Sequence, residues 1–164
     1  MEISFKTISL LVSIILTGLS AGLFYAWEVS VIPGTKRIGN EAYIETMQSI
    51  NKAIINPAFM LIFIGSLVMQ GLSAYQFRGT QVFWFVLGAL IIYALGTFSV
   101  TGMGNVPLNN TLETINANGL SSNELATTRS DYEQPWNRLN RIRTVFAVLS
   151  FVLLQLAVFL PVKQ

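Results

Sequence analysis

Four long apolar stretches, separated by polar ones, run along the 164-residue chain. The first, residues 8–27, carries no charge, and a helix of this length, at about 1.5 Å per residue, covers the roughly 30 Å hydrocarbon layer of a membrane. The whole pattern predicts spans at about 8–32, 54–77, 82–103 and 144–162. We therefore expect an all-α fold: a four-transmembrane-helix bundle, with short amphipathic loop helices on one side, forming a single integral membrane domain over residues 1–164.

The boundaries of these stretches carry further signals. Asn56-Pro57 opens the second stretch, because asparagine caps a helix and proline suits its first turn. The link at residues 78–81 is short, which predicts that the second and third helices form an antiparallel pair. A cleaved signal peptide is the alternative for the first stretch, but residues 8–27 lack a clean Ala-x-Ala cleavage site.

Two longer polar segments, residues 33–53 and 102–143, fall on the same side of the predicted bundle. In the first, apolar residues recur at helical spacing behind Asn40 at a cap position, which predicts an amphipathic helix at the interface or folded over the bundle. These apolar positions are Tyr43, Met47, Ile50 and Ile54. In the second segment, Pro107 and a capping box at Ser121 and Glu124 predict two short helices.

Composition agrees with a lipid environment. The chain has 10 Lys or Arg and 8 Asp or Glu residues, 11% in all, against about 25% in soluble domains. The absence of Cys and His removes thiolate chemistry and the commonest general base and metal ligand, so we expect neither a metal nor a cofactor. A net charge of +2, spread over several segments, does not indicate nucleic acid as a partner.

The distribution of cations predicts an orientation. Seven Lys or Arg residues lie on the side of the long polar segments and three on the other side. The seven are Lys36, Arg37, Lys52, Arg129, Arg138, Arg141 and Arg143, and the three are Lys6, Arg78 and Lys163. The positive-inside rule then places the long segments in the cytoplasm. We expect a multi-pass protein of the cell membrane, plasma or inner, whose partners are lipids and a hydrophobic small molecule; the oligomeric state stays open.

Two groups of polar residues are candidates for chemistry at the mouth of the bundle. Glu28 directly follows the first apolar stretch. A carboxylate costs about 2.5 kcal/mol or more at the bilayer centre and less near the interface. Glu28 is therefore either a carboxylate that reaches interfacial water or a partly desolvated base or ion-pair partner. Residues 104–110 leave the third stretch with Asn105, Pro107 and Asn109, whose amides serve either as helix caps or as ligand contacts.

A third group precedes the last apolar stretch. Trp136, Asn140 and Arg143 occur at i, i+4 and i+7 and would share one helix face. An aromatic plane, an amide and a cation together suit a flat phenolic or quinone-like ligand. The alternative is structural, with Trp136 in an aromatic belt and arginines reaching to headgroups, which accounts well for Arg138 and Arg141.

The chain resembles the anthrone-oxygenase-like family of small four-helix membrane proteins, most of which are catalogued only as a domain of unknown function. The segments that carry the resemblance are Gly22-Leu23-Phe24-Tyr25-Ala26-Trp27 followed by Val31 and Pro33, Tyr43 with Met47-Gln48-Ser49-Ile50-Asn51 and Asn56-Pro57-x-Phe59, Asn105-Val106-Pro107-Leu108-Asn109, and Trp136 with Asn140-x-x-Arg143-Thr144.

Some fungal members oxidise an anthrone to an anthraquinone with molecular oxygen and without a metal or flavin. The resemblance thus implies a cofactor-independent monooxygenase for a hydrophobic phenolic or polyketide-like substrate. In such a reaction Glu28, the only carboxylate beside the predicted spans, would be the base, and Arg143 would stabilise the oxyanion. The substrate would contact Trp27, Tyr43, Asn51, Asn56, Asn105, Asn109, Trp136 and Asn140. The chain departs from the family pattern at Leu139, often tryptophan, and at Arg141, often histidine, which puts anthrone chemistry in doubt.

Two other functions stay open. A non-catalytic protein could bind a lipid or quinone-like molecule in the same pocket, or act as a scaffold for a membrane partner, and the absence of His and Cys favours this reading. A channel or transporter is less favoured, since the predicted spans hold few polar residues beyond Gln70 and Gln155 and no inverted repeat.

Overall fold

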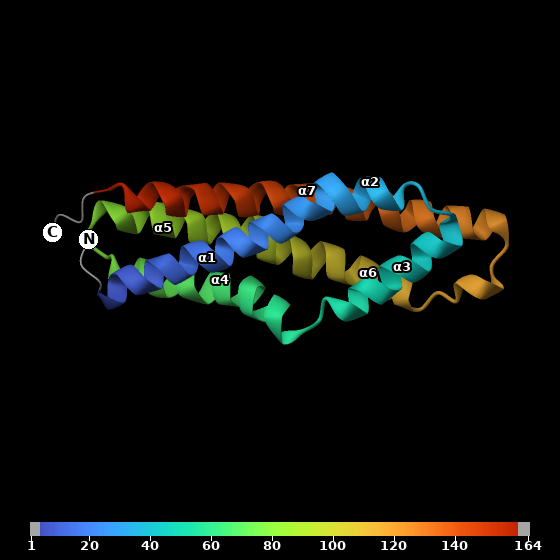
Figure 1. Cartoon of the computed structure of the whole chain (residues 1–164), viewed down its shortest axis with the longest axis horizontal. Coiled ribbons are helices and arrows are strands. Elements are labelled where there is room, and N and C mark those ends of the chain that lie inside the picture. Colours follow the sequence, from blue (N-terminus) through green and yellow to red (C-terminus); the bar gives the residue numbers. More distant parts are fainter. Residues whose placement is uncertain (1–3, 161–164) are drawn as a thin grey trace.

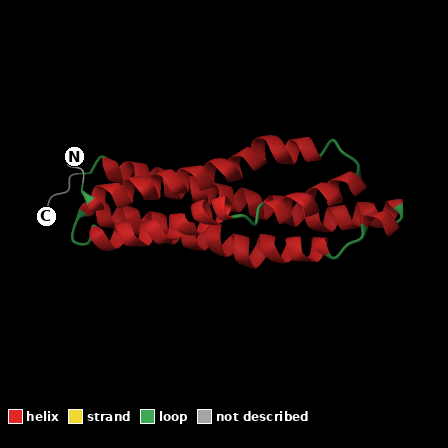
Figure 2. Cartoon of the chain, turned by 60° about the horizontal axis from the view of Figure 1, so that its bottom comes forward, coloured by secondary structure: helices red, strands yellow, loops and turns green. Residues whose placement is uncertain are grey.

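The computed structural model describes residues 4–160, and their helices lie along one long axis (Figure 1). In chain order they are α1 (Phe5–Ala26), η1 (Trp27–Val31), α2 (Ile32–Thr35), α3 (Asn40–Ala53), α4 (Pro57–Gln76), α5 (Gln81–Ile92), η2 (Tyr93–Ser99), η3 (Thr101–Asn105), α6 (Val106–Glu113), η4 (Ala117–Gly119) and α7 (Ser122–Val158). The first three η elements are π-helical and η4 is a 3₁₀ turn. This part of the chain contains no strand, and the turns that join the helices are short (Figure 2).

Four helical stretches are long and apolar enough to cross a membrane: Phe5–Thr35, Pro57–Gln76, Gln81–Glu113 and Ser122–Val158. The expected all-α, four-span bundle is therefore confirmed, and the protein is a multi-pass membrane protein. Large apolar side chains lie on the outside of the helices, among them Leu11, Leu19, Leu61, Val68, Trp84, Leu95 and Val152. Only a lipid environment makes such a surface favourable, because water would oppose so much exposed apolar area.

The molecule has two halves along its long axis (Figure 1). One half contains α1, α4, α5 and the C-terminal part of α7; we call it the apolar bundle. The other half contains α2, α3, α6 and the N-terminal part of α7; we call it the extension. In the extension, α3 has the place beside the other helices that α4 has in the apolar bundle (Figure 1).

The third and fourth helices extend beyond the predicted spans, which corrects the interpretation of residues 102–143 as a loop with two short helices. α7 begins at Ser122 and not near residue 144, and Ser121 and Glu124 form the expected capping box at its start. The third stretch likewise continues through η3 and α6 to Glu113. Hydropathy detects only the part of a helix that lipid surrounds, so the polar continuation of a long helix has the profile of a loop.

Two of the π-helical segments have the same local cause. η1 ends at Val31 and η3 at Asn105, and in each case a proline follows two residues later, Pro33 and Pro107. Proline has no N–H and its ring crowds the carbonyl four residues earlier. A widened π turn relieves this crowding, so each helix continues through its proline. Such turns occur frequently at functional sites.

The amphipathic helix predicted in the first polar segment is α3, and it folds over the helices of the extension. Tyr43, Ile44 and Met47 are 0–1% exposed and pack with Tyr132 and Trp136 of α7. Their spacing places all three on one face of α3. The helix begins one residue earlier than a cap at Asn40 would give, since Gly39 occupies the cap position and Asn40 is the first helical residue.

Inside the apolar bundle, polar side chains join α1 to α4, a feature that the sequence analysis missed. Ser13 and Ser73 hydroxyls lie 3.0 Å apart, and the Gln70 amide donates to the Thr17 hydroxyl at 2.9 Å. All four side chains are fully buried, whereas Gln155 faces outward. In lipid, interhelical hydrogen bonds contribute about 0.6 kcal/mol each, so these contacts help select α4 as the neighbour of α1.

Gly96 in η2 marks the closest approach between the third and fourth helical stretches. A β-carbon built there would lie 1.9 Å from Cγ and Cδ1 of Phe146 and 2.4 Å from its Cβ. Because the Phe146 Cβ is itself in the way, a side-chain rotation alone cannot relieve the clash, and α7 must move.

We expect Gly96→Ala to lower the free energy of unfolding by about 1–3 kcal/mol, since overpacking strains both helices. The measurement is the thermal midpoint of the detergent-purified protein. Gly71→Ala is the matched control, because no atom lies within 4 Å of a β-carbon at that position. Equal midpoints for the two variants would contradict this packing.

Candidate functional site

Most of the polar residues that the sequence analysis singled out meet at the junction between the apolar bundle and the extension. They come from five elements: η1 supplies Trp27 and Glu28, α3 supplies Asn51, η3 and α6 supply Asn105 and Asn109, and α7 supplies Tyr132, Trp136, Asn140 and Arg143. The last four lie at i, i+4, i+8 and i+11 on one face of α7. We call this group the junction cluster.

Asn140 joins a carboxylate to a guanidinium. Its Nδ2 donates to Glu28 Oε1 at 2.7 Å, and its Oδ1 accepts from Arg143 Nε at 3.0 Å and Nη2 at 2.8 Å. These partners allow only one orientation of the amide, because a carboxylate cannot donate and a guanidinium cannot accept. Asn140 is fully buried and Arg143 is 7% exposed.

The Arg143 guanidinium lies between aromatic rings. Its central carbon is 4.5 Å from the centroid of Phe24 and 5.1 Å from that of Trp136. The ring faces stabilise the buried cation, and Asn140 and Glu28 supply the polar and charged partners. Within residues 4–160, Nη1 of Arg143 makes no hydrogen bond, so one donor of this group stays available to a ligand.

Asn109 organises the aromatic side of the cluster. Its Oδ1 accepts from both Trp136 Nε1 and the Tyr132 hydroxyl, each at 2.9 Å. Asn51 in turn donates to the Tyr132 hydroxyl at 3.2 Å, which connects α3 to α7. These bonds fix the Trp136 ring, against which Trp27 packs with centroids 4.9 Å apart.

Asn105 has an unsatisfied acceptor. Its Nδ2 donates to the Trp136 carbonyl at 3.4 Å, while its buried Oδ1 has no hydrogen-bond partner in the described chain. A buried acceptor without a partner costs about 1–3 kcal/mol. Such a group inside a polar cluster is suited to accept a bond from a ligand hydroxyl.

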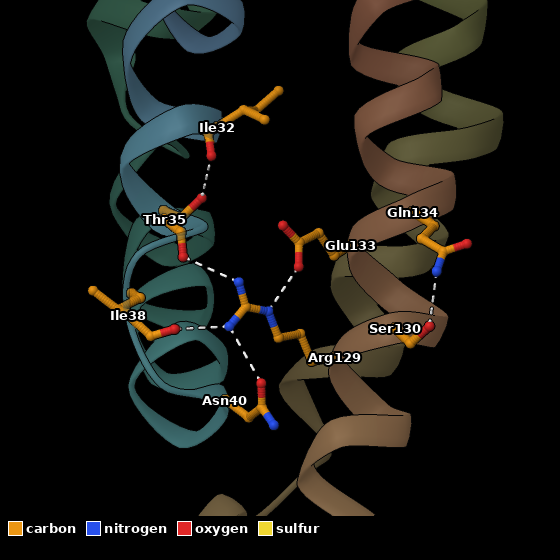
Figure 3. A network of polar contacts seen from close by, with 8 residues as sticks. All are labelled: Ile32, Thr35, Ile38, Asn40, Arg129, Ser130, Glu133 and Gln134. Atoms are coloured by element: carbon orange, nitrogen blue, oxygen red, sulfur yellow. Dashed lines mark hydrogen bonds and ion pairs between the residues drawn. The ribbon is translucent and has the colours of Figure 1, made fainter.

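A second network holds the extension together around Arg129 of α7 (Figure 3). Its guanidinium donates to the carbonyls of Thr35 and Ile38 and to the Asn40 side chain, and it pairs with Glu133 at 2.7 Å. Arg129 thereby satisfies the carbonyls at the end of α2 and anchors the turn before α3.

Tyr43 of α3 belongs to this second network. Arg129 lies over its ring, 4.4 Å from the centroid. Burial raises the pKa of the Tyr43 hydroxyl well above its ordinary value, and the nearby Glu133 charge acts in the same direction. The hydroxyl stays protonated at neutral pH, so Tyr43 is a packing residue in this arrangement and does not supply a charge.

Most, but not all, of the residues expected to contact a ligand lie in the junction cluster. Trp27, Asn51, Asn105, Asn109, Trp136 and Asn140 lie in the junction cluster together with Glu28 and Arg143. Asn56 does not: it caps α4, with Oδ1 accepting from the Phe59 N–H at 2.9 Å. Arg141 is 75% exposed on its side chain and its Nε lies 3.6 Å from Glu28 Oε2.

The sequence analysis missed Tyr132 and Phe24. Tyr132 precedes Trp136 by four residues, so helical spacing would have identified it had residues 122–143 been recognised as part of α7. Phe24 lies inside an apolar stretch, and nothing in the sequence distinguishes it from its neighbours. Only its position beneath Arg143 does so.

Surface cavities of the described residues include the following two. One of about 520 Å³ lies between α1 and the start of α4. The other, of about 620 Å³, lies beside Pro135 on the face of α7 that turns away from the junction cluster. Neither is lined by Glu28 or Arg143.

Together, the fold and the junction cluster define a class of small four-span membrane proteins with a carboxylate, an amide and a guanidinium joined at the end of an apolar bundle. A family model described as anthrone oxygenase matches residues 47–153, and the chain belongs to this family. The matched range includes Asn105, Asn109, Trp136, Asn140 and Arg143 and begins after Glu28. No curated protein and no solved structure matches the chain.

We expect Asn140→Leu to destabilise the protein by about 3 kcal/mol, because it leaves Arg143 and Glu28 without the amide that joins them. The thermal midpoint in detergent measures this loss. Asn137→Leu is the control, because Asn137 lies one turn away on α7 and its side chain makes no hydrogen bond within the described residues. An Asn140 variant as stable as the control would show that the chain of contacts contributes nothing.

Proposed function

We propose that this protein is a cofactor-independent oxygenase that acts on a hydrophobic phenolic substrate. The observation that supports this function is the Asn140 side chain, which joins Glu28 to Arg143 beside the Trp136 ring. A base, a fixed cation and an aromatic face then lie within one cluster, where a ring carrying an acidic C–H and a carbonyl oxygen can be bound. Membership in the anthrone oxygenase family supports the same reaction class.

In the first step, Glu28 removes a proton from the carbon that becomes oxidised, and the substrate becomes an enolate. The negative charge develops on the substrate oxygen, where the free Nη1 of Arg143 stabilises it. Trp136 stacks on the ring, and Asn105 Oδ1 accepts a hydrogen bond from a substrate hydroxyl. Glu28 is the carboxylate of the junction cluster, and it therefore takes the role of base in this step.

In the second step, the enolate gives one electron to molecular oxygen. The resulting radical and superoxide combine to a peroxide on the same carbon. The peroxide takes back the proton held by Glu28 and then loses water, which carries one oxygen atom of O₂ and the two hydrogens of the original CH₂ group. The other oxygen atom remains as a new carbonyl, so atoms and electrons balance with O₂ as the sole oxidant.

We further propose that the membrane is the plasma or inner membrane, with the extension on the cytoplasmic side. The support is the excess of Lys and Arg in and near the extension. Lipids then cover the apolar bundle, and a hydrophobic substrate reaches the junction cluster from the bilayer.

We expect Glu28→Gln to lower turnover about 100-fold or more, the usual contribution of a general base. The glutamine oxygen can still accept from Asn140, so the protein should still fold, with a thermal midpoint lowered by the loss of the charge that compensates Arg143. The assay follows oxygen uptake and quinone absorbance with 1,8-dihydroxyanthrone, with anaerobic samples as blanks. Glu45→Gln, an exposed position on α3, is the control. Full activity in the Glu28 variant would eliminate this mechanism.

The second candidate function is a non-catalytic protein that binds a lipid or quinone-like molecule or acts as a scaffold for a membrane partner. The observation that favours it is the burial of Asn140 and Arg143, which bond to each other and do not line either of the two cavities. Mass spectrometry of the purified protein separates the two functions. An aromatic that gains oxygen favours the enzyme, while an unchanged lipid or an empty protein favours binding or scaffolding.

A further inference from the structure

The cavity of about 520 Å³ is an open groove between α1 and the start of α4. Gly18, Gly22 and Leu23 form its wall on α1, and Ile54, Ala58 and Phe59 form the opposite wall. Gly22 is exposed, and no atom lies within 4 Å of a β-carbon placed on it. The groove is therefore unfilled by the protein's own side chains at this point.

The groove offers nothing to a polar ligand. Its single polar side chain is Asn56, whose Oδ1 accepts from the Phe59 N–H and whose Nδ2 donates to the Ala53 carbonyl at 2.8 Å. The α1 wall lies within the first membrane-spanning stretch, Phe5–Thr35, and the opposite wall lies at the start of the second, Pro57–Gln76, or directly precedes it. The chemistry that fits such a surface is a hydrocarbon chain at bilayer depth.

Both walls lead directly to the junction cluster. Leu23 precedes Trp27 by four residues, one helical turn, and Trp27 packs on Trp136. On the other wall, Ile54 follows Asn51 by three residues, and Asn51 bonds to Tyr132.

An aromatic series makes a third connection. The rings of Phe59 and Phe63 stack with centroids 5.2 Å apart, and Phe63 contacts Phe24 edge-on at 6.3 Å. Phe24 in turn lies beneath the Arg143 guanidinium. The groove therefore adjoins the cluster along both walls, and the aromatic rings of this series pack between them.

We propose that this groove holds the hydrocarbon tail of an amphiphilic aromatic ligand, a phenolic ring system with a carbonyl, an acidic CH₂ group and a long alkyl chain, whose ring lies at Trp136 and Arg143. The proposal rests on the function proposed for the junction cluster and specifies its substrate class. A tail gains little free energy by moving from lipid into an apolar groove, because both surroundings are apolar. The groove therefore selects by shape, accommodating a tail at bilayer depth while the ring binds at the junction.

The test uses the fluorescence of Trp27 and Trp136 in a Trp84→Phe background, since Trp84 is 68% exposed and is remote from the cluster. Binding of 3-pentadecylphenol and of 3-methylphenol to the detergent-purified protein is measured by quenching. Gly22→Leu fills the groove, and Ala58→Leu fills it from the other wall if the first variant does not fold. Gly71→Leu is the matched control, because Gly71 also has open space around it but lies outside the groove.

We expect the groove variants to raise the Kd for 3-pentadecylphenol at least about tenfold and to change that for 3-methylphenol less than about twofold, since only the tail meets the new side chain. The control should leave both values unchanged. If a groove variant affects both phenols equally, or neither, the tail site is wrong while the ring site stands. If neither phenol quenches the unsubstituted protein in this background, the phenol-binding function itself is overturned, and the tail site with it.

Discussion

Asn140 accepts two hydrogen bonds from Arg143 and donates one to Glu28, and the arrangement of the junction depends on this amide. A guanidinium buried next to an apolar bundle is very unfavourable unless its hydrogen bonds and charge are compensated. The compensation comes from two helical stretches at once: Phe24 of α1 and Glu28 of η1 lie on the first, and Asn140 with Trp136 lies on the last, α7. These elements must therefore meet at one level of the molecule. That requirement orders the cluster and leaves one guanidinium nitrogen available for a ligand.

The same level is where the backbone departs from regular α-helix. η1 and η3 each absorb a proline that follows them and carry Glu28 and Asn105 respectively. A helix broken at these prolines would end at the membrane boundary, whereas the π turns let it continue into the extension. Two of the site residues are thus presented by segments whose geometry is set by Pro33 and Pro107. The chemistry of the junction and the continuity of the long helices have a common local origin.

In the proposed function, the site and the groove divide the recognition of one amphiphilic molecule between two surroundings. The polar side is built from amides, hydroxyls and a charge pair that are held by each other, with Asn109 fixing Trp136 and Tyr132. The apolar side is a surface of glycine, alanine and aliphatic or aromatic side chains that faces lipid. A soluble enzyme would have to enclose the apolar part of such a ligand, whereas here the bilayer itself can surround what the protein leaves open.

The sequence by itself determined the all-α class, the number of spans, the amphipathic helix around Tyr43 and Met47, and the helix face shared by Trp136, Asn140 and Arg143, because each rests on local periodicity or hydropathy. It did not determine the extent of α7, since residues 122–143 are polar and hydropathy detects only helix that lies in lipid. The pairing of Glu28 with Asn140, separated by 112 positions, the place of Phe24 beneath Arg143, and the groove beside Gly22 were decided by the tertiary structure. These features depend on which helices become neighbours, and that choice results from packing at positions such as Gly96 and Phe146 and from hydrogen bonds such as Thr17 with Gln70. Neither kind of contact leaves a periodic signal in the chain.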